Sequence, residues 1–304
     1  MDCSGARATW VFPDNAAVAD RGCMMVPRDP GISLREVRVR SVLSPSKLAD
    51  YCVNPYAGCE HGCVYCYARF ATRFSHPGER WGSFVDVRVN APLLLEREAA
   101  RKRPGQVYIS SVSDAWQPSE QVYRLTRRCL ELLLRHGYSL FLQTKNALVL
   151  RDFDLLMGHR NVELGVTVTT LQPGVASLFE PGASSPGERL DVVKKARSIG
   201  LRTFVFLGPL LPGISDGAEG LRQLLEAVAE VAPDRVLVDC LNPRYGMWPA
   251  VSTAVSQYDP CLLALYRRIL YDREERALYT HDLRRRVSDL ATGYGLGTRM
   301  RCCF

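Results

Sequence analysis

Six short apolar segments alternate with longer amphipathic stretches, and this alternation constrains the fold more than any other feature. Strands separated by helices pair in parallel as right-handed βαβ units. Near-continuous apolar strands such as Phe204-Val-Phe-Leu207 indicate that both sheet faces are covered. The sequence therefore predicts an α/β fold, a partial (β/α)6 barrel. The predicted strands are Asp50–Asn54, Gln106–Ser110, Ser139–Gln143, Val162–Val168, Leu201–Leu207 and Arg235–Asp239, and the predicted helices are Ala91–Lys102, Ser119–His136, Arg151–Met157, Pro186–Ile199 and Ala218–Val231.

The segments that flank this core have different patterns. Residues 1–45 carry Pro, Gly and Arg with little periodicity, so we expect an irregular extension with one short strand at Leu34–Arg40. Residues 246–304 are expected to form a helical extension, including a helix at Asp259–Glu275 with an Asp cap and Pro at its first position. The expected organisation is thus 1–45, 46–245 and 246–304.

Composition limits the class of protein. Hydrophobic residues make up 47% and charged residues 23%, which is ordinary for a globular chain and excludes disorder as its main state. No run of 18 apolar residues exists, and Met1–Trp10 lacks the pattern of a secretory signal. We therefore expect a cytoplasmic protein without membrane contact, in which the eleven cysteines are ligands or free thiols rather than disulfides.

Polar residues follow the predicted strands at the point where each strand ends. The carboxyl ends of parallel strands meet at one edge of a sheet, where the chemistry of such folds is found. Six polar strand ends in succession therefore predict one shared site. After the cysteine loop of the first strand, the other five segments are Ser110–Asp114, Thr144–Asn146, Thr167–Thr170, Gly208-Pro209 and Asp239–Asn242.

Cys59, Cys63 and Cys66 form a C-x3-C-x2-C run in the loop after the first predicted strand. A cubic [4Fe–4S] cluster held by three thiolates keeps one iron open for another ligand. Structural zinc sites usually take four ligands from two separated pairs, and the chain has no second pair of comparable spacing. His61 could serve as a fourth ligand, so zinc stays open as the alternative metal.

This run, with Tyr65 before the last cysteine, resembles the signature of the radical S-adenosylmethionine (SAM) superfamily. The segment from Asn54 to Ala68 (NPYAGCEHGCVYCYA), with Ser113-Asp114 followed by Gln117-Pro118 and Glu120, and Thr144-Lys145, resembles the spore photoproduct lyase-like branch. The resemblance covers about residues 46–245. It implies a [4Fe–4S] cluster whose open iron binds SAM, and reductive cleavage of SAM to a 5′-deoxyadenosyl radical that abstracts a substrate hydrogen.

The same resemblance implies roles for individual residues and a partner. Tyr65 would lie beside the adenine, and Lys145 would hold the SAM carboxylate. Hydroxyls for the ribose or methionine portion would come from Thr167 or Thr169. The SAM amino group or ribose would contact Ser113 and Asp114. The ordinary alternatives are a surface lysine, β-branched strand residues and a turn cap. A reducing partner such as ferredoxin or flavodoxin is also implied.

One position departs from the lyase. Ser111 stands where the lyase has its hydrogen-donor cysteine, and an O–H bond is too strong to give a hydrogen atom to a carbon radical. Thymine-dimer repair is therefore not expected. Cys240, at the end of the sixth strand, is a candidate substitute donor, with a buried apolar residue as the alternative reading. Cys302 and Cys303 are further candidate ligands in the tail.

The charge balance permits a polyanionic partner. Lys and Arg exceed Asp and Glu by 39 − 32 = 7, and Arg284-Arg-Arg286 lies in the C-terminal region. These residues could contact a nucleic acid or nucleotide, or could form a solvated helix face. The leading hypothesis is a radical SAM enzyme with an unidentified substrate. The alternative is a non-catalytic iron–sulfur or zinc protein that binds nucleic acid.

Overall fold

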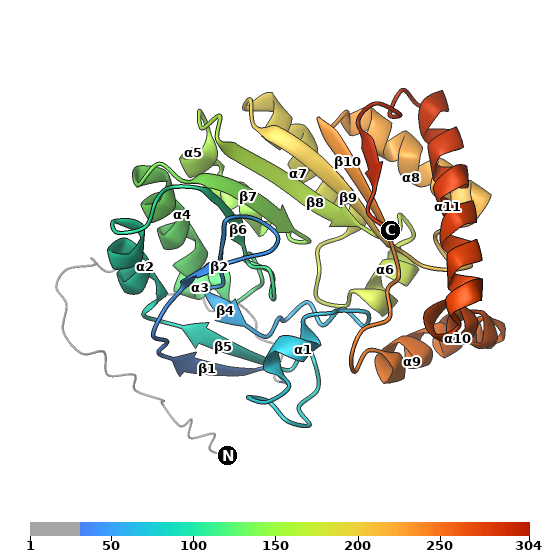
Figure 1. The fold of residues 1–304 in the computed structure, drawn as a ribbon, viewed down its shortest axis with the longest axis horizontal. Helices are drawn as coiled ribbons and strands as arrows, with labels where there is room; N and C mark the ends of the chain where they lie inside the picture. Colours follow the sequence, from blue (N-terminus) through green and yellow to red (C-terminus); the bar gives the residue numbers. More distant parts are fainter. Residues whose placement is uncertain (1–30) are drawn as a thin grey trace, which may run out of the picture. The chain divides into compact units, whose positions relative to one another are not determined.

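The computed structural model describes residues 31–304, and its centre is a sheet of eight strands (Figure 1). The strand order is β11-β10-β9-β8-β7-β6-β3-β2, and every neighbouring pair is parallel except β2 and β3. The six predicted strands are confirmed as β3 and β6 to β10. The bounds are β2 Leu43–Pro45, β3 Tyr51–Val53, β6 Gln106–Ile109, β7 Ser139–Thr144, β8 Val162–Val168, β9 Arg202–Leu210, β10 Arg235–Cys240 and β11 Met300–Cys302.

Helices cover one face of this sheet and leave the other face more open. In β7, Leu140 and Leu142 are buried in the same apolar core as Leu130 and Leu133 of a covering helix, whereas Phe141 is half-buried on the opposite face. This period-two alternation defines a helix-covered face and an open face. The covering helices are α2 Ala91–Ala99, α4 Leu125–Arg135, α7 Pro186–Ser198 and α8 Ala218–Val231; shorter elements are α3 Glu120–Tyr123, η1 Ala147–Asp152, α5 Phe153–Leu156 and α6 Pro173–Phe179.

Two helices that the sequence predicts as continuous are interrupted, because a carboxylate caps a new helix inside each. Arg124 is left-handed (φ 50°), and the Glu120 carboxylate accepts the backbone N–H groups of Thr126 and Arg127, the start of α4. The predicted helix Asp259–Glu275 is likewise divided into η2 Pro260–Leu262, α10 Leu263–Tyr271 and the start of α11 Arg273–Gly293. Asp272 accepts two N–H groups of α11. Capping thus overrides helix propensity at both places.

A smaller sheet and the C-terminal segment flank the core. β1 (Ser33–Val37) pairs in parallel with β5 (Phe84–Arg88), which pairs with β4 (Tyr56–Ala57). The strand expected at Leu34–Arg40 therefore exists but belongs to this smaller sheet. Within the described part of the expected extension, β2 pairs with β3 in the main sheet. Residues 1–30, with Cys3 and Cys23, lie outside the described residues.

The C-terminal segment is mostly helical, as expected, through α9 (Trp248–Tyr258), α10 and α11. Its last residues add a strand as well, because β11 pairs with β10 with Met300 opposite Val236. The domain limits at 45 and 245 stay predictions. No helix in the described part of the chain is long and apolar enough to cross a membrane.

Candidate active site

The cysteine loop runs from β4 to α1 (Arg69–Thr72) and is fixed by close backbone packing. Gly62 has a φ of +61°, which favours glycine. The N–H of Gly182 donates to the His61 carbonyl at 3.0 Å, and a Cβ at Gly182 would lie only 2.3 Å from the Glu60 carbonyl oxygen. On another side, the N–H of Val64 donates to the Phe179 carbonyl at 2.9 Å. The loop is therefore held by the segment around the end of α6.

The three cysteines of this loop are free thiols; Cys59 and Cys63 are buried and Cys66 is half-buried. Within residues 31–304, no three His, Cys, Asp or Glu side chains surround a point that one metal ion could occupy. A zinc site needs ligands that converge on one ion, whereas a [4Fe–4S] cluster takes one thiolate per iron. The soft donor set therefore fits the cluster. Burial raises the pKa of Cys63 to about 12, so metal binding must displace its proton.

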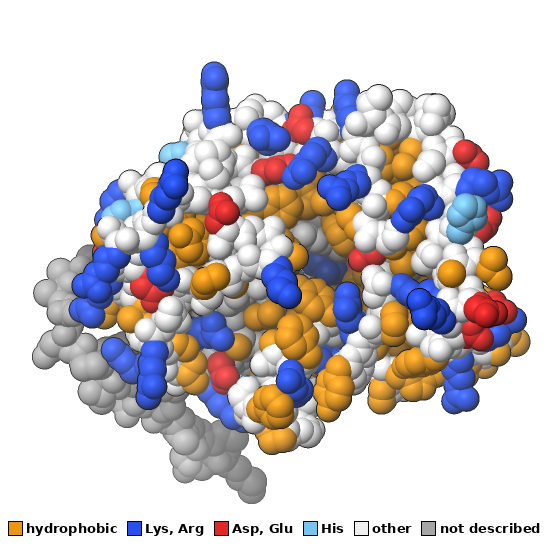
Figure 2. All heavy atoms as spheres, viewed as in Figure 1, with side chains coloured by type: hydrophobic (Ala, Val, Ile, Leu, Met, Phe, Trp, Pro, Cys, Tyr) orange, Lys and Arg blue, Asp and Glu red, His pale blue; other side chains and the backbone are white. Residues whose placement is uncertain are grey.

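Lys145 lies beside this loop, with its ammonium over the Tyr65 ring. Its Nζ lies 5.7 Å from the centre of that ring and, within the described part of the chain, makes no hydrogen bond or ion pair. Burial lowers the pKa of Lys145, but the electrostatic effects of Cys63 and Glu180 outweigh burial, and the net pKa is raised. The side chain stays charged. Figure 2 shows a hollow ringed by apolar side chains with a basic side chain in its depth.

Glu180, directly after α6, is a buried carboxylate with several partners, and its role was not predicted from the sequence. Its Oε1 accepts hydrogen bonds from the Tyr65 hydroxyl and from Thr169 Oγ1, the latter at 3.0 Å. Its Oε2 pairs with the buried Arg189 at 2.6 Å. Burial raises the pKa of Glu180, but the charges of Arg189 and Lys145 outweigh burial and lower it below its usual range. Glu180 therefore holds the hydroxyl groups of Tyr65 and Thr169 in place, and both of its oxygens already contact protein groups.

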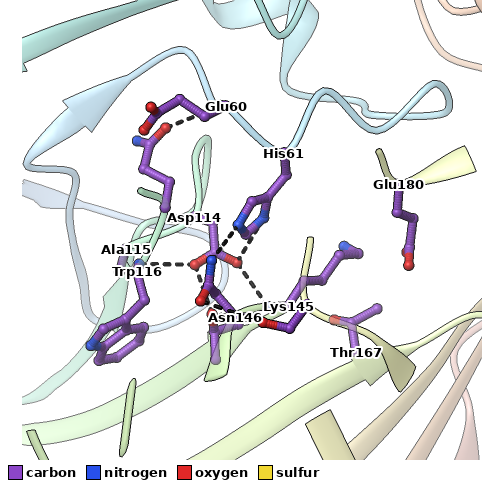
Figure 3. Close-up of polar contacts among 12 residues, drawn as sticks. Glu60, His61, Asp114, Ala115, Trp116, Lys145, Asn146, Thr167 and Glu180 are labelled. Carbon is purple, nitrogen blue, oxygen red and sulfur yellow. Dashed lines mark hydrogen bonds and ion pairs between the residues drawn. The ribbon is translucent and has the colours of Figure 1, made fainter. Parts of the chain in front are cut away.

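Asp114 is also occupied by the protein itself (Figure 3). Its Oδ1 accepts from Thr144 Oγ1 at 2.7 Å and from the Trp116 N–H at 2.9 Å. Its Oδ2 accepts from the Lys145 N–H at 2.8 Å and faces His61 Nδ1 at 3.5 Å. Ser113, expected beside it, donates its hydroxyl to the Tyr56 carbonyl at 3.3 Å. The structure thus brings Asp114 and Lys145 together and uses the carboxylate to position the loops.

A chain of side-chain hydrogen bonds crosses the open face of the sheet and ends at Thr167. Tyr108 donates its hydroxyl to Gln143 Oε1, and Gln143 Nε2 donates to Thr167 Oγ1, both at 2.8 Å. Thr167 therefore keeps its own hydroxyl proton for another acceptor. Thr169 instead shares its hydroxyl between Glu180 and the Gly208 carbonyl. Tyr108 and Gln143 could be identified from the sequence only by their alternate positions in strands.

Cys240 is not brought to the open face. It is fully buried in the same core as Val236 and Val238, and its Sγ lies 3.5 Å from Nη2 of Arg276 in α11. Its expected orientation into the barrel mouth is wrong, because strand alternation gives the open-face position to Asp239. Its role as hydrogen donor stays a prediction.

Ser111, which follows β6, and the tail cysteines, which lie in and after β11, are located toward opposite ends of the strand order of the main sheet. Ser111 Oγ lies 3.3 Å from Nδ2 of Asn54, which also contacts the free Cys52 thiol at 3.7 Å. Cys302 lies in β11, where it pairs with Val238 of β10, and Cys303 donates its N–H to the Val238 carbonyl. The tail cysteines are therefore part of a sheet edge, and their role as ligands stays a prediction.

Comparisons with known proteins agree with this arrangement. Residues 53–225 match the radical SAM superfamily model. An uncharacterized protein of Methanocaldococcus jannaschii is 34% identical over 61% of this chain and 70% of its own length. A protein of Pseudomonas phage M6 named radical SAM Nalpha-GlyT isomerase is 26% identical over 71% of this chain and 44% of its own length.

Among solved structures, spore photoproduct lyase complexed with dinucleoside spore photoproduct superposes with a TM-score of 0.63. It is 17% identical and covers 89% of this chain and 82% of its own, which shows a shared fold. The superfamily uses a [4Fe–4S] cluster and SAM, and the three thiols here suit that cluster. The chain belongs to the radical SAM superfamily of enzymes.

Proposed function

We propose that this chain binds a [4Fe–4S] cluster and SAM and uses them for hydrogen abstraction from a substrate at the open face. The observation that carries this proposal is Lys145: a charged ammonium with no hydrogen-bond acceptor among the described residues, beside the cysteine loop and Tyr65. Ammonium N–H donors that find no acceptor at a half-buried position are costly unless a ligand accepts their hydrogen bonds. The SAM carboxylate is that acceptor in this proposal.

The cofactors would be held by a small set of residues. Cys59, Cys63 and Cys66 would ligate three irons, Lys145 would pair with the SAM carboxylate, and the Tyr65 ring would lie beside the adenine. Thr167 would donate its free hydroxyl proton, while Ser113, Asp114 and Thr169 would act by positioning these groups. When bound, the cluster and SAM supply the 5′-deoxyadenosyl radical that takes a hydrogen atom from the substrate. A low-potential protein such as ferredoxin or flavodoxin would reduce the cluster.

A nucleotide or single-stranded nucleic acid is the proposed substrate class. The support comes from an aromatic rim that continues from the cysteine loop: Tyr67, Phe70, Arg73 and Phe74. Phe74 is 84% exposed, and the Arg73 guanidinium lies 4.3 Å from the centre of its ring. Tyr67 and Phe70 stack and are both exposed. Exposed aromatic rings with interleaved arginines suit base stacking, worth about 1–3 kcal/mol per base.

The reaction itself would differ from that of the lyase, because Ser111 cannot supply the hydrogen atom of a thiol. The molecule bound to that similar lyase structure is a dinucleoside spore photoproduct. For this chain we propose only a nucleotide-class substrate whose C–H bond is broken.

The substrate proposal is tested by isotope transfer with the reconstituted, reduced enzyme. SAM is incubated with deuterated nucleotides, deuterated single-stranded oligonucleotides or deuterated non-nucleotide metabolites, and the 5′-deoxyadenosine formed is analysed for deuterium by mass spectrometry. We expect deuterium from a nucleotide-class molecule in 5′-deoxyadenosine, and weaker oligonucleotide binding by about tenfold or more in Phe74→Ala. Leu278→Ala, 70% exposed on α11, is the matched surface control. Deuterium from a non-nucleotide molecule only, with the rim variant unchanged, would reject the substrate class and leave SAM cleavage standing.

A further inference from the structure

His61 lies within the cysteine loop, between Cys59 and Cys63, and its ring joins two other loops (Figure 3). The residue is 1% exposed. Nδ1 lies 3.5 Å from Oδ2 of Asp114, after β6, and Nε2 lies 3.1 Å from Nδ2 of Asn146, after β7. Both ring nitrogens therefore have partners from outside the loop. The expectation that His61 could be a fourth metal ligand is not met, because neither nitrogen is free.

The hydrogen-bond pattern assigns the tautomer of this ring. Asn146 Oδ1 accepts the Leu148 N–H at 2.9 Å and thereby caps η1, so its amide nitrogen must be the group that faces His61. An amide NH2 only donates, and therefore Nε2 of His61 is the unprotonated acceptor. Nδ1 is then the protonated nitrogen of the neutral ring and lies 3.5 Å from Oδ2 of Asp114.

The two partners of His61 also hold the peptide that carries Lys145. Asp114 Oδ2, the oxygen that faces His61, accepts the Lys145 N–H at 2.8 Å. Asn146 is the next residue in the chain. The imidazole is thus connected to this peptide on both sides, through a carboxylate and through an amide. In Figure 3 the Lys145 side chain leaves this cluster toward the side where Glu180 lies.

We propose that His61 is a positioning residue that fixes the cysteine loop against the Lys145 peptide, so that the cluster and the ammonium meet the same SAM molecule. This inference rests on the proposed function, because it assigns the geometry between two of its binding groups. His61 itself touches neither SAM nor iron in this account. It acts through the placement of Lys145 and through the orientation of the loop between two ligands, as outer-shell partners of metal sites do.

The chain contains a matched control for this role. His76 is also buried, its two ring nitrogens contact Glu79 and Asp86 at 3.0 and 2.9 Å, and its ring stacks on Phe84. It supports the segment before β5 and makes no contact with the Lys145 peptide. Replacement of either histidine by leucine removes two side-chain contacts of a buried ring, so the difference between the two variants isolates the role of His61.

The first test is made on the metal-free chain by nitrogen-15 NMR of its five histidine rings, assigned by single substitutions. We expect an unprotonated Nε2 and a protonated Nδ1 in the neutral His61 ring. Asn146→Asp keeps the oxygen that caps η1 and replaces the donor by an acceptor, so the proton should appear on Nε2. A wild-type ring with the opposite tautomer would overturn the assignment.

The second test compares SAM binding in variants with equal iron and sulfide content. His61→Leu and Asn146→Ala should raise the KM for SAM by about 10- to 100-fold and weaken the change in the cluster's EPR spectrum on SAM addition. Their effects should not add in the double variant. His76→Leu should keep the wild-type KM and spectrum. Normal SAM binding in a fully loaded His61→Leu, or equal losses in both histidine variants, would overturn the inference. If His61→Leu takes up no iron, Asn146→Ala decides by the same criteria. Wild-type enzyme that fails to cleave SAM would reject the proposed function instead.

Discussion

The ends of β6 and β7 and the end of β10 lie at the same edge of one sheet, but they use polar side chains differently. At β6 and β7, Asp114 binds the Lys145 peptide and faces His61, and the Lys145 ammonium is left without a partner among the described residues. At β10, the Arg276 guanidinium donates to the Asn242 amide oxygen and to the Leu241 carbonyl.

This difference separates a binding site from a structural cluster. Polar groups at the β10 end satisfy one another, and Cys240 packs there against Arg276 in the core. Around Lys145 the polar groups also contact one another, but the Lys145 ammonium stays available to a ligand. Ammonium N–H donors without an acceptor cost stability at a half-buried position, and a fold retains them where a ligand accepts their hydrogen bonds.

The largest effect is expected from the cysteine loop. Cys63→Ala should abolish both cluster uptake and SAM cleavage, because only two thiolates then remain to hold the irons. Cys240→Ala, at the β10 end, should keep a full cluster. Iron and sulfide analysis with EPR spectroscopy measures both. Loss of the cluster in the Cys240 variant as well would remove the distinction between the two regions.

The next effect concerns stability. Glu180→Gln leaves the buried Arg189 without its counter-charge and should lower the free energy of unfolding by about 3–5 kcal/mol at pH 7. The pKa of Glu180 is lowered in the fold, so its charge stabilises above the unfolded pKa, and this contribution is lost as pH falls through the folded pKa. The deficit of the variant should therefore shrink below pH about 4.3. Urea denaturation of the metal-free chain at a series of pH values measures this deficit. A deficit that does not change with pH would contradict the stabilising role of the Glu180 charge.

Lys145 and Arg276 provide the direct contrast between ligand binding and stability. Lys145→Met should weaken SAM binding by about 10- to 100-fold, the value of a charge-assisted hydrogen bond of about 1.5–3 kcal/mol, with little loss of stability. Arg276→Met should instead lower the stability and leave SAM binding nearly unchanged, because the Arg276 guanidinium hydrogen-bonds the residues that follow β10. SAM titration of the loaded variants and thermal denaturation give the two quantities. Equal effects on both quantities in both variants would break the comparison.

The smallest effect is expected at Cys240, which the sequence suggested as a hydrogen donor. Because its thiol is buried on the helix-covered face, Cys240→Ala should cost about 1 kcal/mol of stability and leave substrate-dependent deuterium transfer unchanged. Cys52→Ala, whose thiol belongs to the open face opposite Tyr108 of β6, is the matched variant. A loss of transfer in the Cys240 variant alone would restore it as the donor.

The sequence predicts the core strands and the metal-binding loop because their signals are local. Apolar runs mark strands wherever they pair, and three cysteines within eight residues identify their own loop. The surroundings of the site are not local. Tyr65 and Glu180 are 115 residues apart, and the contact between them depends on the packing of α6 against the loop. No periodicity predicts such a pair.

The predicted boundaries of two helices were wrong for a related reason. Glu120 and Asp272 lie inside the predicted helices, but each carboxylate accepts N–H groups at the start of a later helix, α4 and α11 respectively. The strand β11 has three residues, too short for an alternating pattern, and is defined only by its register with β10. The role of Asp114 toward SAM stays a prediction. Its protein contacts could not be predicted from the sequence, because three of the four come from other segments of the chain.

The formation of 5′-deoxyadenosine tests the central claim most directly. The chain is reconstituted anaerobically with iron and sulfide, reduced with dithionite and mixed with SAM, and the products are separated by chromatography with mass detection. We predict 5′-deoxyadenosine and methionine from the wild-type chain, a strongly reduced rate from Lys145→Met at limiting SAM, and none from Cys63→Ala. A fully loaded and reducible cluster that yields no 5′-deoxyadenosine would contradict the account.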